Sequence, residues 1–161
     1  MYSVSSRQRI EDLVERELAV LPEDSLIADA VKAMKDRGIS SVLVRSVFSS
    51  AENPIITGIV TERDILYRVI GGHKGPYKVI LRDVMSSPVI AIDGGVSFVE
   101  AISLMRTLKI RRLLVVKRDK TKEVPLGLVT LVSIIENVPL ESLSLANMKS
   151  NSTDNAVKNS L

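Results

Sequence analysis

The chain has 161 residues, of which 45% are hydrophobic and 25% are charged, and its formal net charge is +3. This length suffices for one well-packed core and is short for two independent ones. The sequence contains no cysteine, which excludes disulfide frameworks, thiolate nucleophiles and cysteine metal sites. No apolar run approaches the roughly 20 residues of a membrane-spanning helix, and the N-terminus lacks the apolar stretch of a signal peptide. We therefore expect a soluble, cytoplasmic protein.

The first segment, about residues 5–17, has the pattern of an amphipathic helix. Ile10, Leu13 and Val14 fall at helical spacing among charged residues, after a serine pair that could cap the helix. We expect this helix to lie against the main body of the protein.

The next segment predicts a unit of alternating strands and helices. A short strand is expected at 18–21, before a helix that Gly38 ends. Apolar strands follow at 42–44 and 55–60, and a second helix starts at 65–70. The apolar face of the first helix is predicted from positions i, i+3, i+4 and i+7, which hold Ile27, Ala30, Val31 and Met34.

The second half of the chain repeats this unit. Residues 96–115 align with 25–44 and share five identities, Ala30/Ala101, Met34/Met105, Ile39/Ile110, Leu43/Leu114 and Val44/Val115. The corresponding strands are expected at 89–92, 113–116 and 125–130, and the last helix at 134–138. Neither unit could cover both faces of its small sheet alone. We therefore predict an α/β (α+β) fold in which two pseudo-twofold-related β-α-β-β-α units pack through their sheets, with an N-terminal helix added.

The predicted elements divide the chain into five parts. They are an N-terminal helix at 1–17, a first unit at 18–72, a glycine-rich linker at 73–82, a second unit at 83–139 and a disordered tail at 140–161. The loops at 45–57 and 117–124 differ in length and charge between the repeats, so we expect both to be exposed and mobile.

A Thr-x-x-Asp turn stands where a strand of the first unit meets its second helix. Thr61 and Asp64 can both face a point beyond the helix N-terminus, where free backbone N–H groups favour an anion. The same spacing is close to a capping box, which is the more frequent explanation. In the second unit Thr130 persists but the acid becomes Ser133, a poor reciprocal cap, and this favours a polar role that the two turns share.

With these motifs in place, the chain resembles a tandem pair of CBS domains, the cystathionine-β-synthase-type modules that together form a Bateman module. The resemblance rests on the Ala-x-x-x-Met helices, the strands ISSVLV and IRRLLV, and the turns GIVTERD and GLVTLVS, and it covers about residues 18–138. It implies two clefts beside the pseudo-twofold axis. Each would hold AMP, ADP or ATP, or an adenosyl compound such as S-adenosylmethionine, with no cofactor besides this ligand.

In the first cleft, the resemblance implies that Asp64 binds the ribose hydroxyls and that Thr61 contacts phosphate or ribose. Arg63 is a phosphate-binding candidate. The adenine is expected against three isoleucines, Ile59, Ile90 and Ile110.

In the second cleft, the equivalent residues are Thr130, Ser133 and Leu128, opposed by Ala19 and Ile39. This cleft departs from the commoner family pattern because Ser133 offers one short hydroxyl in place of a carboxylate. We therefore expect weaker ribose binding there.

Two adjacent arginines make the repeats chemically unequal. Arg111 and Arg112 stand where the first repeat has Ser40 and Ser41. A guanidinium can hold a phosphate through two parallel hydrogen bonds. The alternative, equally weighted, is that both arginines are solvated or pair with nearby acids.

These residues favour a non-catalytic regulatory module that binds an adenine nucleotide and signals its presence to an unidentified partner protein. The family also predicts homodimers, whose surface could be supplied by apolar residues of the helix after each motif, namely Ile65, Leu66, Val69, Ile134 and Ile135. A dimerisation module with vestigial clefts is one alternative. A nucleic-acid-binding protein is another and is disfavoured, because the chain has five aromatic residues and dispersed basic ones. No nucleophile, metal cluster or acid/base pair is visible, so we expect neither an enzyme nor a metal site.

Overall fold

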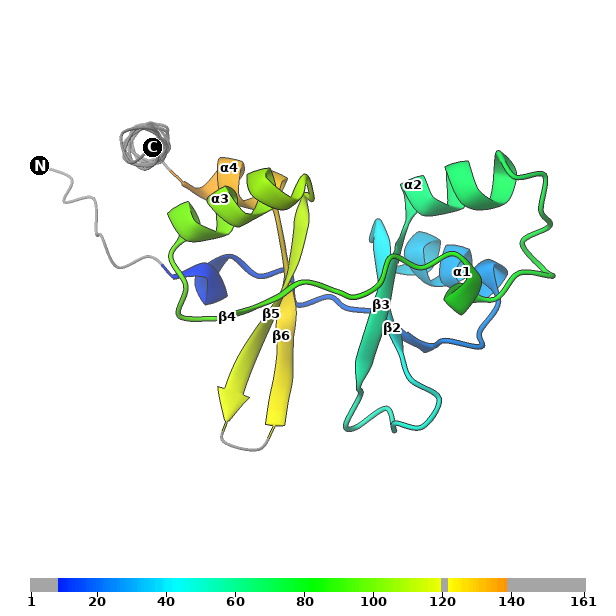
Figure 1. Ribbon diagram of the computed structural model, residues 1–161, viewed down its shortest axis with the longest axis horizontal. Coiled ribbons are helices and arrows are strands. Elements are labelled where there is room, and N and C mark those ends of the chain that lie inside the picture. The colour runs from blue at the N-terminus through cyan, green and yellow to red at the C-terminus, as the bar shows by residue number, and fades with distance from the viewer. Residues whose placement is uncertain (1–8, 120–121, 139–161) are drawn as a thin grey trace, which may run out of the picture. The chain divides into compact units, whose positions relative to one another are not determined.

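The computed structural model describes residues 9–119 and 122–138 (Figure 1). Its backbone contacts divide the chain into two compact units. The first-repeat unit comprises Glu17–Ile90, and the second-repeat unit comprises Met1–Arg16 together with Ala91–Leu161. The predicted disordered tail lies outside the described residues.

The first-repeat unit has a three-stranded sheet with helices against one face (Figure 1). The strand order is β1-β2-β3, with β1 parallel and β3 antiparallel to β2. The motif helix begins as α2 and continues in wider π-helical turns as η2. The elements in chain order are β1 (Val20–Pro22), α1 (Ile27–Arg37), β2 (Ser41–Arg45), β3 (Ile56–Thr61), α2 (Glu62–Asp64), η2 (Ile65–Ile70) and η3 (Leu81–Asp83).

The second-repeat unit has the same arrangement, with strand order β4-β5-β6. Its motif helix is a regular α-helix throughout. The elements are η1 (Ile10–Leu13), β4 (Ala91–Asp93), α3 (Phe98–Leu108), β5 (Arg112–Asp119), β6 (Lys122–Thr130) and α4 (Leu131–Asn137). Within the part of the chain that the structure describes, no helix is both long and apolar enough to cross a membrane.

The strand register confirms the internal repeat. Ser41 pairs with Thr61 in the first sheet, and Arg112 pairs with Thr130 in the second. Both hairpins also shift register at equivalent points, after Val44 and after Val115. The two motif threonines therefore occupy equivalent ends of equivalent strands.

Helices α1 and α3 form where the apolar spacing predicted the first helix of each unit. In α1, Ile27, Ala30 and Met34 are buried in a core that includes Val42, Val44 and Val60 from the sheet. Val31, which the pattern placed on the same face, is instead exposed. Gly38 ends α1 in the left-handed conformation at φ 65°, and Lys109 adopts φ 55° at the equivalent position after α3.

Two local predictions were wrong. Among residues 9–17, helical structure is confined to the single 3-10 turn of η1, and Val14 after it is extended. Ile10 and Leu13 are buried, so the apolar pattern correctly indicated burial although no full helix forms. The described residues of the stretch 117–124 are exposed, as predicted, but they belong to β5 and β6 and not to a loop, because Lys117, Arg118 and Asp119 pair across to β6. Cross-strand pairing extends the strands despite their charged side chains.

Each unit is completed by a segment that precedes the other repeat in the chain. We call residues 9–15 and 80–86 the exchanged segments. Residues 80–86 pair with the first-repeat unit through bridges Leu26–Ile80 and Ile59–Ser86. Residues 9–15 pair with the second-repeat unit through the equivalent bridges Arg9–Ser97 and Glu15–Leu128. The buried residues of these segments, Ile10 and Leu13 in one and Leu81 and Val84 in the other, also correspond.

A glycine in each motif strand makes room for the exchanged segment. A Cβ atom on Gly127 would lie 2.6 Å from the carbonyl oxygen of Glu15 and 2.9 Å from Cβ of Val14. A Cβ on Gly58 would meet the side chain of Met85, which corresponds to Val14. The glycine of each Gly-x-x-Thr turn is therefore explained by this close approach of another segment.

We predict that Gly127→Ala lowers the free energy of unfolding by about 1–3 kcal/mol, since backbone atoms of Glu15 must move to admit the methyl group. Gly58→Ala should cost less, because Met85 is a flexible side chain. Urea denaturation of both variants measures the difference. Gly75→Ala is the control, since a Cβ there has no atom within 4 Å. Equal stability of the Gly127→Ala and Gly75→Ala variants would contradict this packing.

Candidate functional site

The first motif turn is a complete capping box at the junction of β3 and α2. The backbone N–H and the hydroxyl of Thr61 donate to Oδ2 of Asp64, at 2.9 and 2.8 Å. The backbone N–H of Asp64 donates to Oγ1 of Thr61 at 3.2 Å. The local explanation of the Thr-x-x-Asp spacing is thus confirmed, and it fixes the carboxylate at the start of the helix.

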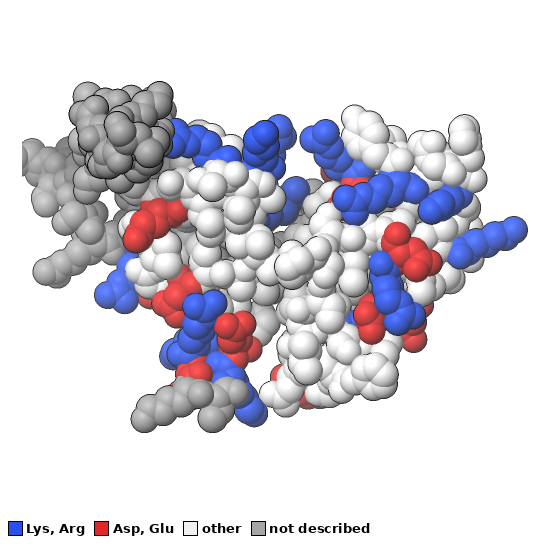
Figure 2. Space-filling model, viewed as in Figure 1, with Lys and Arg blue, Asp and Glu red and all other residues white. Residues whose placement is uncertain are grey.

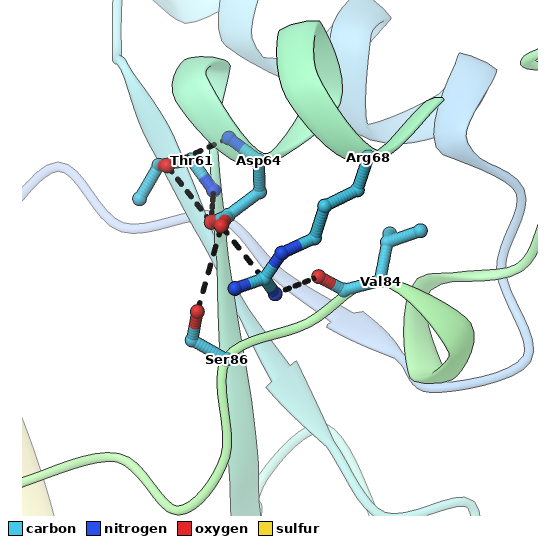
Figure 3. A network of polar contacts seen from close by, with 5 residues as sticks. All are labelled: Thr61, Asp64, Arg68, Val84 and Ser86. Carbon is cyan, nitrogen blue, oxygen red and sulfur yellow. Dashed lines mark hydrogen bonds and ion pairs between the residues drawn. The ribbon is translucent and has the colours of Figure 1, made fainter. Parts of the chain in front are cut away.

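Two further side chains approach the other oxygen of Asp64 (Figure 3). Nη1 of Arg68 lies 3.5 Å from Oδ1 and donates to the carbonyl oxygen of Val84 at 2.6 Å. The hydroxyl of Ser86 lies 3.5 Å from the same Oδ1. Arg68 belongs to η2, whereas Val84 and Ser86 belong to the exchanged segment, so the network ties this segment to the motif helix.

The two oxygens of Asp64 differ in what they can still accept. Oδ2 receives two short hydrogen bonds, whereas Oδ1 has two longer contacts of 3.5 Å, an ion pair with Arg68 and a hydrogen bond from Ser86 at the outer limit of such bonds. The residue is only 9% exposed. Oδ1 is therefore the atom of this turn that can exchange a weak contact for a shorter bond to a ligand hydroxyl.

The second motif turn is also a reciprocal cap, contrary to the expectation for Ser133. The backbone N–H of Thr130 donates to Oγ of Ser133, and the N–H of Ser133 donates to Oγ1 of Thr130, both at 3.0 Å. The Ser133 hydroxyl in turn donates to the carbonyl oxygen of Thr130 at 2.9 Å. A serine caps well here because its oxygen accepts from the N–H of Thr130, which is equivalent to the Thr61 N–H that donates to the aspartate in the first turn.

A carboxylate also lies beside the second turn, but it comes from the exchanged segment. The hydroxyl of Thr130 donates to Oε1 of Glu15 at 3.1 Å. Glu15, Arg68 and Ser86 were not among the site residues predicted from the sequence. The i, i+4 spacing of Asp64 and Arg68 could have indicated their ion pair, whereas the contacts of Glu15 and Ser86 join segments far apart in the sequence.

The three arginines predicted to bind phosphate differ in their exposure and in their contacts with the motif turns. Arg63 is exposed, and its guanidinium carbon lies 5.3 Å from the ring centroid of Tyr67. The carbonyl oxygen of Arg111 accepts the N–H of Leu131, the first residue of α4, and the residue is exposed. Arg112 is the cross-strand partner of Thr130 and is part-buried. Both predicted arginines of the second repeat therefore adjoin its motif turn.

The predicted adenine-contacting residues divide between the two units. Within the first-repeat unit, Ile59 pairs with Leu43 and bridges to Ser86, two residues before Thr61 in β3. Within the second-repeat unit, Leu128 is buried beside Thr130 and bridges to Glu15. Ala19, Ile39 and Ile90 belong to the first-repeat unit and Ile110 to the second. The predicted opposition of Ile110 to the first turn, and of Ala19 and Ile39 to the second, stays a prediction.

A metal site requires a cluster of ligating side chains. Among the described residues, no group of three or more His, Asp or Glu side chains could hold a metal ion. His73, the single histidine, is exposed in the segment after η2.

Comparison with known proteins identifies the family to which these two units belong. The CBS domain family matches the chain twice, over residues 10–71 and 81–139. The chain belongs to the CBS domain family. Each match includes its own motif turn, so the protein is a tandem CBS pair. Each match also begins at a buried residue of an exchanged segment, Ile10 in the first match and Leu81 in the second.

Two curated relatives match most of this CBS pair. An uncharacterized protein of Methanopyrus kandleri is 37% identical over 118 residues, which are 73% of this chain and 56% of that protein. Inosine-5'-monophosphate dehydrogenase of Nitrosopumilus maritimus is 31% identical over 124 residues, which are 77% of this chain and 23% of that enzyme. The chain thus spans about half of the first relative and a quarter of the second.

Solved structures share the fold at lower sequence identity. A CBS domain protein from Pyrobaculum aerophilum complexed with AMP has a TM-score of 0.71 at 22% identity, covering 86% of this chain and 99% of that one. A hexameric CBS-CP12 protein from bloom-forming cyanobacteria has a TM-score of 0.70 at 22% identity, covering 86% of this chain and 76% of that one. At these identities the likeness establishes the tandem CBS architecture.

We predict that removing either cap destabilises the protein. Asp64→Ala should lower the free energy of unfolding by about 1–2 kcal/mol and Ser133→Ala by about 1 kcal/mol, because each leaves the backbone N–H of the motif threonine without its acceptor. Asp64→Asn should cost less, since the amide oxygen can still accept. Glu62→Ala, which removes an exposed acid from the same helical turn, is the control. Chemical denaturation that ranks Glu62→Ala level with Asp64→Ala would contradict the importance of the cap.

Proposed function

We propose that this tandem CBS pair is a non-catalytic regulatory module that binds AMP, ADP or ATP beside its motif turns and signals their presence to a partner protein. The observation that carries the proposal is the position of Asp64, whose carboxylate is fixed by its own cap while Oδ1 keeps only two long contacts. Such an oxygen can accept a hydrogen bond from a ribose hydroxyl. The AMP complex of the Pyrobaculum protein, which shares this fold, supports the choice of ligand.

The basic residues favour a phosphorylated ligand over an adenosyl sulfonium. Arg63 follows Thr61 by two residues and is exposed, and Arg111 adjoins the N-terminus of α4 and is exposed. Guanidinium groups attract phosphate and repel the positive sulfonium of S-adenosylmethionine. We therefore place the adenine nucleotides first and S-adenosylmethionine second.

Signalling requires that the ligand favour one conformation over another. In the first-repeat unit, Asp64 contacts Ser86 and Arg68 contacts Val84, so two side chains of the motif helix touch the exchanged segment. A ribose that competes for Oδ1 would weaken the Ser86 contact. The exchanged segment leads directly into the second repeat, which gives occupancy a covalent route to it.

A homodimer forms part of the proposal, since the motif helices expose apolar side chains. These are Leu66, Tyr67 and Ile70 after the first turn, and Val132 and Ile135 after the second. Val69 and Ile134, which the sequence placed on this surface, are instead fully buried in their own units. The exposed apolar side chains also favour the second candidate function, a dimerisation module without ligand. Nucleic-acid binding receives less support, because acidic side chains lie among the basic ones on the face of each unit shown in Figure 2.

We predict that calorimetric titration with AMP, ADP and ATP detects binding by the parent protein. Asp64→Ala should weaken binding at the first-repeat site about tenfold or more, because a charged acceptor of ribose hydroxyls is lost. Glu62→Ala should bind like the parent. Light scattering of the same samples reports the oligomeric state.

Two outcomes would count against this function. If the parent binds none of these nucleotides and yet forms dimers, the dimerisation module is the better description. If it binds them but Asp64→Ala matches the parent, the ligand site lies away from the first motif turn.

A further inference from the structure

We infer that Glu15 is the ribose-binding carboxylate of the second-repeat unit and replaces the acid that Ser133 lacks. The inference deepens the proposed function and rests on it, since it concerns how the second site holds the same nucleotides. It assigns a ligand-binding role to a residue that lies outside both motif turns.

Glu15 and Ser86 occupy equivalent places in the two units. In the first-repeat unit, Ser86 and Ile59 exchange backbone hydrogen bonds of 2.9 and 3.0 Å. In the second-repeat unit, Glu15 and Leu128 exchange backbone hydrogen bonds of 2.7 and 3.2 Å. The two pairs also correspond along the sequence, because Leu128 stands two residues before Thr130 just as Ile59 stands two before Thr61.

The serine and the carboxylate have changed places between these units. The first-repeat turn carries Asp64, and its exchanged segment supplies Ser86. The second-repeat turn carries Ser133, and its exchanged segment supplies Glu15. Each unit therefore keeps one carboxylate and one serine hydroxyl beside its motif threonine.

The threonine hydroxyl makes the same kind of bond in both units. Thr61 donates to Asp64 at 2.8 Å, and Thr130 donates to Glu15 at 3.1 Å. Glutamate reaches the threonine from the neighbouring strand segment because its side chain is one methylene longer than that of aspartate. The threonine thus orients a carboxylate in each case.

Glu15 retains the capacity to bind a ligand. Its side chain is exposed, and among the described residues its one side-chain hydrogen bond is the bond from Thr130 to Oε1. Oε2 is then available to accept from a ribose hydroxyl, as Oδ1 is in Asp64. The backbone bonds of Glu15 to Leu128 hold the residue in place before any ligand binds, which lowers the entropic cost of binding.

This assignment revises the expectation that the second site binds ribose weakly. That expectation followed from the motif turn alone, where Ser133 offers a single hydroxyl. With Glu15 included, each site has one carboxylate and one serine hydroxyl.

The test isolates the second-repeat site on an Asp64→Asn background, which removes the carboxylate of the first site. AMP, ADP and ATP are titrated into the full chain by calorimetry. Adding Glu15→Gln to this background should weaken the remaining binding at least tenfold. It should also abolish the preference for AMP over 2′-deoxy-AMP, because that preference depends on the charged acceptor of the ribose hydroxyl. Glu123→Gln, at the opposite end of β6, makes the same change of charge as a control.

An exchange of residues separates a ligand contact from a structural one. On the same background, Glu15→Ser should lose binding, and Glu15→Ser combined with Ser133→Asp should regain it, since the combination recreates the arrangement of Asp64 and Ser86. Thermal unfolding without nucleotide checks that all of these variants are folded.

The outcomes distinguish this inference from the proposed function. If the parent binds nucleotide but Glu15→Gln leaves binding and the 2′-deoxy preference of the Asp64→Asn protein unchanged, the role of Glu15 is overturned and the proposed function stands. If the parent binds none of the three nucleotides, both are overturned.

Discussion

The structure depends on the short backbone pairing between each exchanged segment and the strand that leads into the motif turn. Ser86 pairs with Ile59, and Glu15 pairs with Leu128, through two hydrogen bonds each. This pairing requires a glycine in the motif strand, since Gly127 has the backbone of Glu15 within the space of a missing Cβ. It also buries an apolar residue of each segment, Leu81 or Ile10, in the unit that it completes. Sheet edge, core and motif turn are thus held by the same contact.

The polar chemistry of the two units follows from this pairing. Because the exchanged segment passes beside the motif threonine, its side chain at that point becomes part of the motif's surroundings. In one unit the segment adds a serine to an aspartate, and in the other it adds a glutamate to a serine. Comparing the turns alone makes the repeats look unequal, whereas comparing the complete units shows the same groups in a different order along the chain.

Local patterns in the sequence predicted the elements well and their partners poorly. Apolar spacing identified α1 and α3, and the alignment of the repeats identified the paired hairpins. Both signals come from residues close together in the sequence, within one helix or within one pair of strands. The burial of Ile10 was visible, but a 3-10 turn and a full helix share that pattern over four residues. Ser133 was judged a poor cap from its length alone, although its hydroxyl reaches the N–H of Thr130. The contact of Glu15 with Thr130 joins residues more than a hundred positions apart, and neither propensity nor periodicity encodes such a distance.

The exchanged segments also bear on how a chain of this kind can arise. A polypeptide with a single repeat carries a leading segment but no second repeat to receive it, and a second copy of the same chain could supply that acceptor. Duplication within one gene makes that pairing intramolecular and raises the effective concentration of each segment for its acceptor. It also frees the two acceptor strands to diverge, since each then meets a different donor. A carboxylate on the turn of one unit and on the donor segment of the other is an arrangement that the fused chain can hold because its two halves differ in sequence.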